Sequence, residues 1–198
     1  MKTTLKTAIA LVALSFSVNA QTTWNVDPAH SKLGFSISHM MVSETEGKFK
    51  IYEGKVSSKT INDFADASVE FSVDVNSIDT ENDKRDGHLK SADFFDVEKY
   101  PTITFKSKSV KAGKIKNTYT VTGDITMHGV TKPITLSAIG AANVVKDPYG
   151  MQRYAFKVTG KLNRTDFGLK YNSVLEAGGV AIGEEVNIDC TIEITVAK

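Results

Sequence analysis

The segment VNIDCTIEITV, residues 186–196, alternates apolar and polar side chains from end to end. Successive side chains of a β-strand point to opposite faces, so this segment has one apolar face and one polar face. An antiparallel sheet that buries one side has this pattern, whereas the strands of a parallel α/β sheet are apolar throughout. The segment therefore predicts an antiparallel, all-β protein.

The same alternation recurs along the rest of the chain. Many long amphipathic strands in one domain either form two packed sheets or close on themselves, and strands longer than the usual ~5–6 residues favour a tall barrel. His128-Gly129 is placed for a tight hairpin, and Asp147 to Gly150 has a proline at a turn position. We therefore predict an eight-stranded antiparallel β-barrel. The expected strands are 23–27, 32–39, 46–57, 67–78, 101–111, 117–127, 133–145 and 152–163, with 185–197 as a ninth candidate.

The stretch SIDTENDKRDGHLKSADFFDVEKYPTITF, residues 77–105, interrupts the strand pattern. Thr80 stands three residues before Asp83, a variant of the capping box that predicts a short helix over 81–90. A second helical turn over 91–97 is expected to lower two phenylalanines onto the barrel. We expect this insert to close one end of the barrel.

Another irregular segment, residues 165–184, is rich in glycine and is expected to line the opposite rim or the mouth. It lies between the last two predicted strands.

The first twenty residues have the features of a secretory signal peptide. Lys2 and Lys6 form a basic region, a short apolar stretch follows, and small side chains precede Gln21. We expect cleavage after Ala20, which leaves a single domain over residues 21–198 in the periplasm. Because residue 21 is not cysteine, no lipoprotein anchor is expected, and no later stretch is apolar for long enough to span a membrane.

Composition narrows the class of function. Loss of Lys2 and Lys6 lowers the formal net charge from +1 to −1, and this balance argues against nucleic acid as a partner. The single cysteine, Cys190, cannot form an internal disulfide, and its place in the alternating strand predicts a buried apolar side chain.

Several segments together resemble one family. The pieces SIDT, RDGHLKSADFFD and YPTITF stand in its order and spacing within residues 77–105. Four further segments agree: WNVDPAHSKLGFSISHMMVSETEGKF (24–49), GDITMHGVTKPITL (123–136), LNRTDFGLKY (162–171) and VAIGEEVNID (180–189). On these segments the chain resembles the YceI family over nearly the whole mature domain, with Tyr171 where a tryptophan is expected. The resemblance implies an extended lipocalin-like barrel whose apolar pore binds polyprenyl chains, quinones or fatty-acid derivatives.

The apolar faces of the predicted strands would line such a pore. A small barrel is either packed shut by its side chains or holds one ligand, and the residues alone leave both alternatives open. The resemblance favours the pore. The expected lining residues are Phe35, Ile37, Phe71, Val73, Phe105, Val121, Ile125, Phe156, Val158, Ile188 and Ile192.

Five polar residues in the motifs have two interpretations. Arg85, Asp86 and His88 either hold the head group of a ligand at the pore mouth or form structural ion pairs that fasten the insert to the barrel. Arg164 and Asp166 have the same two alternatives.

The sequence shows no pattern typical of a metal site or an enzyme. His30, His39, His88 and His128 do not have the spacing of recognised metal ligands, so no metal and no cofactor is expected. No motif marks a nucleophile or a cofactor-binding loop, and we expect a protein that is not an enzyme.

The sequence thus predicts an exported barrel that carries or sequesters a long-chain apolar lipid, a polyisoprenoid or an isoprenoid quinone. The other expected partners are a membrane, in transient contact, and a second copy of the chain in a homodimer. The alternative is a stress-related structural or adaptor protein with a closed barrel that acts through its outer surface. A continuous cavity open to solvent would favour carriage, and a collapsed interior would favour the adaptor.

Overall fold

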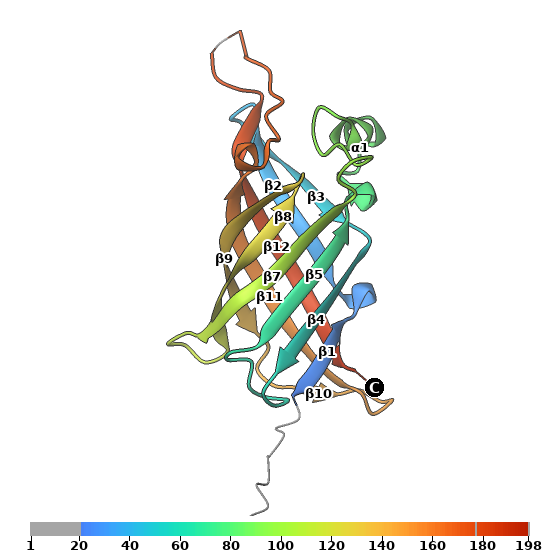
Figure 1. Ribbon diagram of the computed structural model, residues 1–198, viewed down its shortest axis with the longest axis vertical. Coiled ribbons are helices and arrows are strands. Elements are labelled where there is room, and N and C mark those ends of the chain that lie inside the picture. The colour runs from blue at the N-terminus through green and yellow to red at the C-terminus, as the bar shows by residue number, and fades with distance from the viewer. Residues whose placement is uncertain (1–20, 177, 198) are drawn as a thin grey trace, which may run out of the picture.

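The computed structural model describes residues 21–176 and 178–197, so the predicted signal peptide over residues 1–20 lies outside the described residues. One twelve-stranded sheet curls into a tall barrel with a short helix beside one end (Figure 1). The strands are β1 (Thr22–Val26), β2 (Lys32–His39), β3 (Ser43–Phe49), β4 (Tyr52–Ser58), β5 (Ser68–Asp74), β6 (Ile78–Asp79), β7 (Thr102–Ala112), β8 (Thr118–Met127), β9 (Val130–Gly140), β10 (Val145–Lys146), β11 (Gln152–Asn163) and β12 (Ile182–Val196). The helices are α1 (Asp83–Lys90) and the 3-10 turns η1 (Pro28–His30), η2 (Val75–Ser77) and η3 (Arg164–Phe167).

The sheet closes through its last strand. Around the ring the order is β11–β9–β8–β7–β5–β4–β1–β12, and β12 pairs with β11 from Arg153↔Thr195 to Asn163↔Glu185. Every pairing is antiparallel, which confirms the predicted eight-stranded antiparallel barrel. β12 is long enough to pair with β1 at one end of the barrel and with β2 at the other.

The expected strand over 133–145 ends at Gly140 in β9, and Val145 belongs to β10. Two further expected strands are each broken once. The stretch predicted as 46–57 forms β3 and β4, and the stretch predicted as 67–78 forms β5, η2 and β6. The breaks are adjacent because the Ser77 hydroxyl accepts hydrogen bonds from the backbone N–H groups of Lys50 (3.1 Å) and Ile51 (2.9 Å). The Lys50 N–H also donates to the Ser77 carbonyl at 3.1 Å, whereas for Ile51 the side-chain oxygen takes the place of a backbone acceptor.

The helix begins two residues later than predicted. Asn82 is its N-cap and accepts a hydrogen bond from the Arg85 N–H at 2.9 Å. The predicted cap, Thr80, instead donates its hydroxyl to Asp86 at 2.5 Å. The second helical turn expected over 91–97 is a series of turns, and it places Phe94 and Phe95 against the barrel as predicted. In the part of the chain that the structure describes, no helix is both long and apolar enough to cross a membrane.

The predicted hairpin at His128-Gly129 is confirmed. Both residues have positive φ (51° and 73°), as a type I′ turn requires, and they connect the paired residues Met127 and Val130. The following strand therefore starts at Val130, before the predicted 133. Val130 pairs with Met127 directly after the two-residue turn, so the β8–β9 ladder begins there.

The helical insert lies at the rim and closes the barrel only in part. α1 and the connection between β11 and β12 lie at the same end, while both ends of the described chain lie at the other (Figure 1). That other end is closed by the loop between β4 and β5, whose Phe64 is only 2% exposed. The Phe64 ring stacks on Tyr154 and meets Trp24 at 5.5 Å between centroids. The expected closure by the insert is therefore only partial: Phe94 and Phe95 of the insert line the cavity at their end, and a loop aromatic fills the opposite end.

Candidate ligand-binding cavity

The barrel encloses an apolar cavity of about 810 Å³. Small-molecule sites typically span about 300–1,000 Å³, so this volume suits a sizeable organic ligand. The structure places every residue of the expected lining in the cavity wall. These residues are Phe35, Ile37, Phe71, Val73, Phe105, Val121, Ile125, Phe156, Val158, Ile188 and Ile192.

The cavity opens at the end that carries the insert. His39, Asn82 and Lys84 line it there and are exposed to solvent. At the far end it is bounded by Phe64 and Val110, which are buried. The cavity is therefore a blind tube with a single polar mouth among the described residues.

Glycines in the wall keep the tube open. Phe35 pairs across the strands with Gly47, and a Cβ atom at Gly47 would lie 2.4 Å from the Phe35 ring. Phe71 pairs in the same way with Gly54, where a Cβ would lie 2.9 Å from the ring. Both rings occupy the space that a neighbouring side chain would fill. Because each ring lies over a glycine, it stays against the wall and does not project across the lumen.

An aromatic cluster joins the insert to the loop after η3. The centroid of the His88 ring is 5.0 Å from that of Phe94 and 4.7 Å from that of Tyr171. Phe94 and Tyr171 are themselves 5.0 Å apart. This contact places the glycine-rich segment at the mouth, which was one of its two predicted positions. Tyr171 supplies the aromatic ring at the position where the family resemblance implied tryptophan.

Three polar residues of the insert were predicted to bind a head group or to form structural ion pairs. Arg85 and His88 line the cavity, whereas Asp86 is buried and accepts hydrogen bonds from the Thr80 N–H (3.0 Å) and hydroxyl. Arg85 donates to the Thr80 hydroxyl and carbonyl at 2.8 and 2.7 Å. Thr80, and not a direct Arg85–Asp86 ion pair, fastens α1 to the barrel.

Arg164 and Asp166 are separated by the structure. Asp166 is exposed and lies outside the cavity wall. Arg164 lines the cavity, is only 4% exposed, and donates to the carbonyl oxygens of Gly183 (2.8 Å) and Tyr171 (3.0 Å). Burial of this guanidinium lowers its pKa, because water no longer stabilises the charge.

Cys190 lies in the cavity wall and is 3% exposed, as its strand pattern predicted. Its thiol contacts the Gly34 carbonyl at 3.6 Å. Burial raises the pKa of this thiol to about 11, since the thiolate would lose its hydration. The cysteine therefore behaves as an apolar lining residue at neutral pH.

Exposed apolar side chains stand beside the mouth. Met41 is 66% exposed and Val42 is 84% exposed in the turn between β2 and β3, and Val174 is 85% exposed in the loop before β12. The two segments meet where the Met40 N–H donates to the Ala181 carbonyl at 2.8 Å. We call Met40, Met41, Val42 and Val174 the apolar rim. Met40 and Met41 both have positive φ, 51° and 60°, a conformation that costs energy for residues other than glycine.

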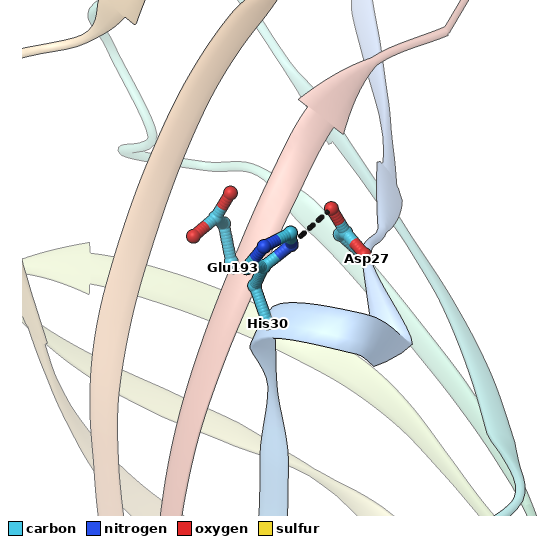
Figure 2. A group of neighbouring side chains, drawn as sticks. All are labelled: Asp27, His30 and Glu193. Carbon is cyan, nitrogen blue, oxygen red and sulfur yellow. Dashed lines mark hydrogen bonds and ion pairs between the residues drawn. The ribbon is translucent and has the colours of Figure 1, made fainter.

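A cluster outside the barrel brings together Asp27, His30 and Glu193, whose polar atoms lie within 4.8 Å of one another (Figure 2). His30 contacts Asp27 at 2.9 Å, and Glu193 projects from β12 beside them. The Arg153 guanidinium donates to Asp27 at 2.7 Å and to Glu193 at 2.6 Å. Because the Arg153 guanidinium already neutralises these carboxylates, the cluster is a poor candidate for a metal site. Its hydrogen bonds instead join three segments of the barrel wall.

Some cavity residues were missed by the sequence prediction. Leu136 and Leu162 line the cavity and follow the same strand alternation as the predicted set, so that pattern was a usable signal. Phe64 lies in a loop, where no periodicity marks it. Lys84 and His39 at the mouth lie inside two of the segments that resemble the family, but no pattern marks them as cavity residues, and only the three-dimensional fold brings them together.

The fold and the cavity define a class of protein: single-domain antiparallel β-barrels with an enclosed apolar pore. Solved structures share this fold. BcnA of Burkholderia cenocepacia superposes with a TM-score of 0.72 at 26% identity, over 85% of this chain and 98% of that one. A YceI protein of Campylobacter jejuni gives 0.66 at 30% identity, over 87% and 96%. A polyisoprenoid binding domain from Saccharophagus degradans shares the fold, with a TM-score of 0.61 at 18% identity over 88% and 98%.

A family model described as a YceI-like domain matches residues 24–194. A UPF0312 protein of Staphylococcus aureus is 38% identical over 178 residues, which are 89% of this chain and 99% of that protein. The chain belongs to the YceI-like family, as the sequence motifs predicted.

Proposed function

We propose that the protein binds a long-chain apolar lipid, a polyisoprenoid or an isoprenoid quinone, inside the barrel and carries or sequesters it in the periplasm. The observation that supports this role is the blind apolar tube of about 810 Å³ with one polar mouth. Each methylene group moved from water into such a tube contributes about 0.8 kcal/mol before the loss of chain freedom is counted. Binding, rather than catalysis, is the activity that this lining supports.

The cavity volume sets a length for the enclosed chain. A water molecule takes up about 30 Å³ of liquid, and a methylene group is of similar size, so the cavity has room for roughly 25 carbon atoms. A longer isoprenoid tail would extend through the mouth. In this arrangement Arg85, His88 and Arg164 lie where the polar end of the lipid would emerge.

The apolar rim suggests how the lipid enters. Met41 and Val42 project beside the mouth, in a turn whose methionines adopt an unfavourable backbone conformation. Such a surface is suited to transient contact with a bilayer, where these side chains leave water. The periplasmic location, cleavage after Ala20 and the homodimer remain predictions from the sequence.

The adaptor alternative requires a packed interior, and the large open cavity favours carriage over it. The first experiment is mass spectrometry of an organic extract of the mature protein, purified from its own periplasm without detergent. One dominant isoprenoid species at close to one per chain would support the proposal. A lipid-free extract from a protein that also takes up no added isoprenoid would contradict it.

A variant pair tests the lining itself. Val121→Asp puts a carboxylate into the cavity wall, and the lipid would have to strip it of water, so we expect lipid affinity to fall on the order of 100-fold. Thr120→Asp is the control, because the neighbouring position is exposed. Equal lipid content in the two folded variants would show that the lipid binds elsewhere.

A further inference from the structure

The hydrogen-bonded wall of the barrel is incomplete along one strand near the mouth. β3 pairs with β2 along its whole length, but on its other side it pairs with β6 only at Lys48 and Phe49. In the described part of the chain, no strand lies against the remaining stretch from Ser43 to Gly47 on that side. An extended segment of this length spans roughly 15 Å. Over that distance, no backbone ladder closes the wall.

Only side chains separate the cavity from the outside along this edge. An outer hollow of about 430 Å³ lies between the β3 edge and the segment 79–81. Thr45, Thr80 and Arg85 line both this hollow and the cavity, so the wall between them is one side chain thick. The Thr80 methyl group lies against Gly47, where a Cβ atom would be 2.9 Å away. We call this thin part of the wall, which these side chains close, the side slot.

The two sides of the side slot are held together weakly. Glu44 and Glu46 line the outer hollow from β3, and Glu81 lines it from the insert. None of these three carboxylates belongs to an ion pair within the described chain. Among the residues that the structure describes, no hydrogen bond or ion pair joins 43–47 to 80–90. The side slot can therefore open without the loss of a polar contact.

The shape of the cavity makes entry through the mouth difficult for a lipid that comes from a bilayer. The polar end of an amphipathic lipid lies at the bilayer surface and its chain points inward, whereas a blind apolar tube receives the chain first. Entry through the mouth therefore requires the whole chain to leave the bilayer and turn through water, which costs free energy for every methylene group exposed. A side slot lets the chain pass sideways while the polar end stays at the mouth.

The side slot begins at the apolar rim. Met41 and Val42 directly precede Ser43, the first residue of the unpaired edge, and both are exposed. A rim that is seated in a bilayer brings the slot to the membrane surface. At its other end, the pairing of Lys48 with Asp79 limits how far the slot can open. The rim and the slot thus form one continuous path from the bilayer to the cavity.

We propose that the side slot between β3 and the insert is the membrane-facing entrance of the cavity, through which the chain of a bilayer lipid passes sideways. This inference rests on the proposed lipid-binding function and adds the surface and the route by which the lipid is loaded. The polar mouth remains open to small ligands that arrive from water.

A cross-link across the side slot tests this route. Glu46→Cys/Glu81→Cys places one exposed cysteine on each side, and bismaleimidoethane joins them, while Cys190 is buried and does not compete. The delipidated mature protein is mixed either with phosphatidylethanolamine–phosphatidylglycerol vesicles that contain solanesol or with farnesol in water. Mass spectrometry of protein separated from the vesicles follows the loading. We expect the cross-link to slow loading from vesicles at least about tenfold and to leave farnesol binding from water unchanged.

Two controls isolate the effect of closing the side slot. The same variant with both cysteines capped by N-ethylmaleimide has the same chemistry without a bridge, and it should load from vesicles at the wild-type rate. Lys161→Cys/Glu185→Cys, cross-linked in the same way, bridges an exposed pair on the continuous β11–β12 wall. It should also load at the wild-type rate.

The outcomes are distinct. Equal loading from vesicles by the cross-linked and the capped protein would overturn the side entrance and leave lipid carriage intact. A cross-link that slows solanesol and farnesol alike would also overturn it, because both ligands would then share one route. If the wild-type protein binds neither solanesol nor farnesol, the proposed function itself fails.

Discussion

The ring of Phe71 lies over Gly54 on the neighbouring strand, and a Cβ atom at Gly54 would be 2.9 Å from two of its carbons. The same Cβ would lie 2.8 Å from Val26 Cγ2, which blocks relief on that side. Gly54→Ala should therefore push the Phe71 ring into the lumen, destabilise the protein by about 1–3 kcal/mol and weaken binding of the longest chains. Isothermal titration with isoprenoid alcohols of increasing length checks this. Gly87→Ala is the matched control, because nothing lies within 4 Å of that position. Unchanged chain-length dependence in Gly54→Ala would show that the wall yields outward.

Phe64 closes the far end of the tube. Its ring contacts Tyr154 at 4.9 Å and Phe156 at 5.1 Å between centroids. Phe64→Ala is expected to cost about 3–5 kcal/mol in the free energy of unfolding and to let a longer chain pass deeper into the barrel. Urea unfolding measures the first effect. Ile115→Ala, at a 74% exposed position of the same end, should change stability by less than about 0.5 kcal/mol.

Cys190 can report on occupancy. With a pKa of about 11, only about one thiol in ten thousand is ionised at pH 7. Alkylation of the lipid-free protein should be slow at neutral pH and should rise about tenfold per pH unit up to pH 10. Bound lipid should suppress it, since the thiol lines the cavity. Fast labelling at pH 7 in the folded, loaded protein would contradict both the burial and the site.

Arg153 makes stability depend on pH. Its guanidinium holds the pKa of Asp27 and of Asp147 below their usual range, with smaller help from neighbouring hydrogen bonds. For carboxyls whose pKa is lowered on folding, the stabilisation is complete above their ordinary pKa and is lost as pH falls through the folded value. Arg153→Gln should therefore lower Tm most near neutral pH, and the gap to wild type should narrow between pH 4 and pH 2, as measured by calorimetry. A gap that widens in acid would contradict this assignment.

The apolar rim should affect transfer and not affinity. Met41→Asp/Val42→Asp places charge where the side chains would enter a bilayer, so we expect transfer of an isoprenoid from vesicles to slow at least about tenfold. The dissociation constant for a soluble short-chain isoprenoid should stay the same. Ile115→Asp, at the other end of the barrel, is the control. Equal transfer rates in all three proteins would mean that the lipid enters without membrane contact.

The cavity wall was predictable because strand geometry has a period of two. Once Phe71 and Val73 share a face, closing the sheet directs both inward whatever the loops do. The break at Lys50 was not predictable, since it depends on the hydroxyl of Ser77, which is distant in the sequence. The hydrogen-bond partners of Arg164 were not predictable either. Its partners are backbone carbonyls, and these leave no trace in residue type.

The position of β12 has a consequence for how the chain folds. It is the last strand in the sequence, yet it seals the ring by pairing with β11 on one side and with β1 and β2 on the other. Until Ile182–Val196 has paired with the rest of the sheet, two strand edges and the apolar inner face are exposed to solvent. Exposed edges and apolar surface promote aggregation and proteolysis. The pairing of Trp24 with Val196 joins residues near the two ends of the domain, so we expect ring closure to be a slow, late step of folding. A chain truncated before β12 should therefore fail as a whole, rather than lose one strand.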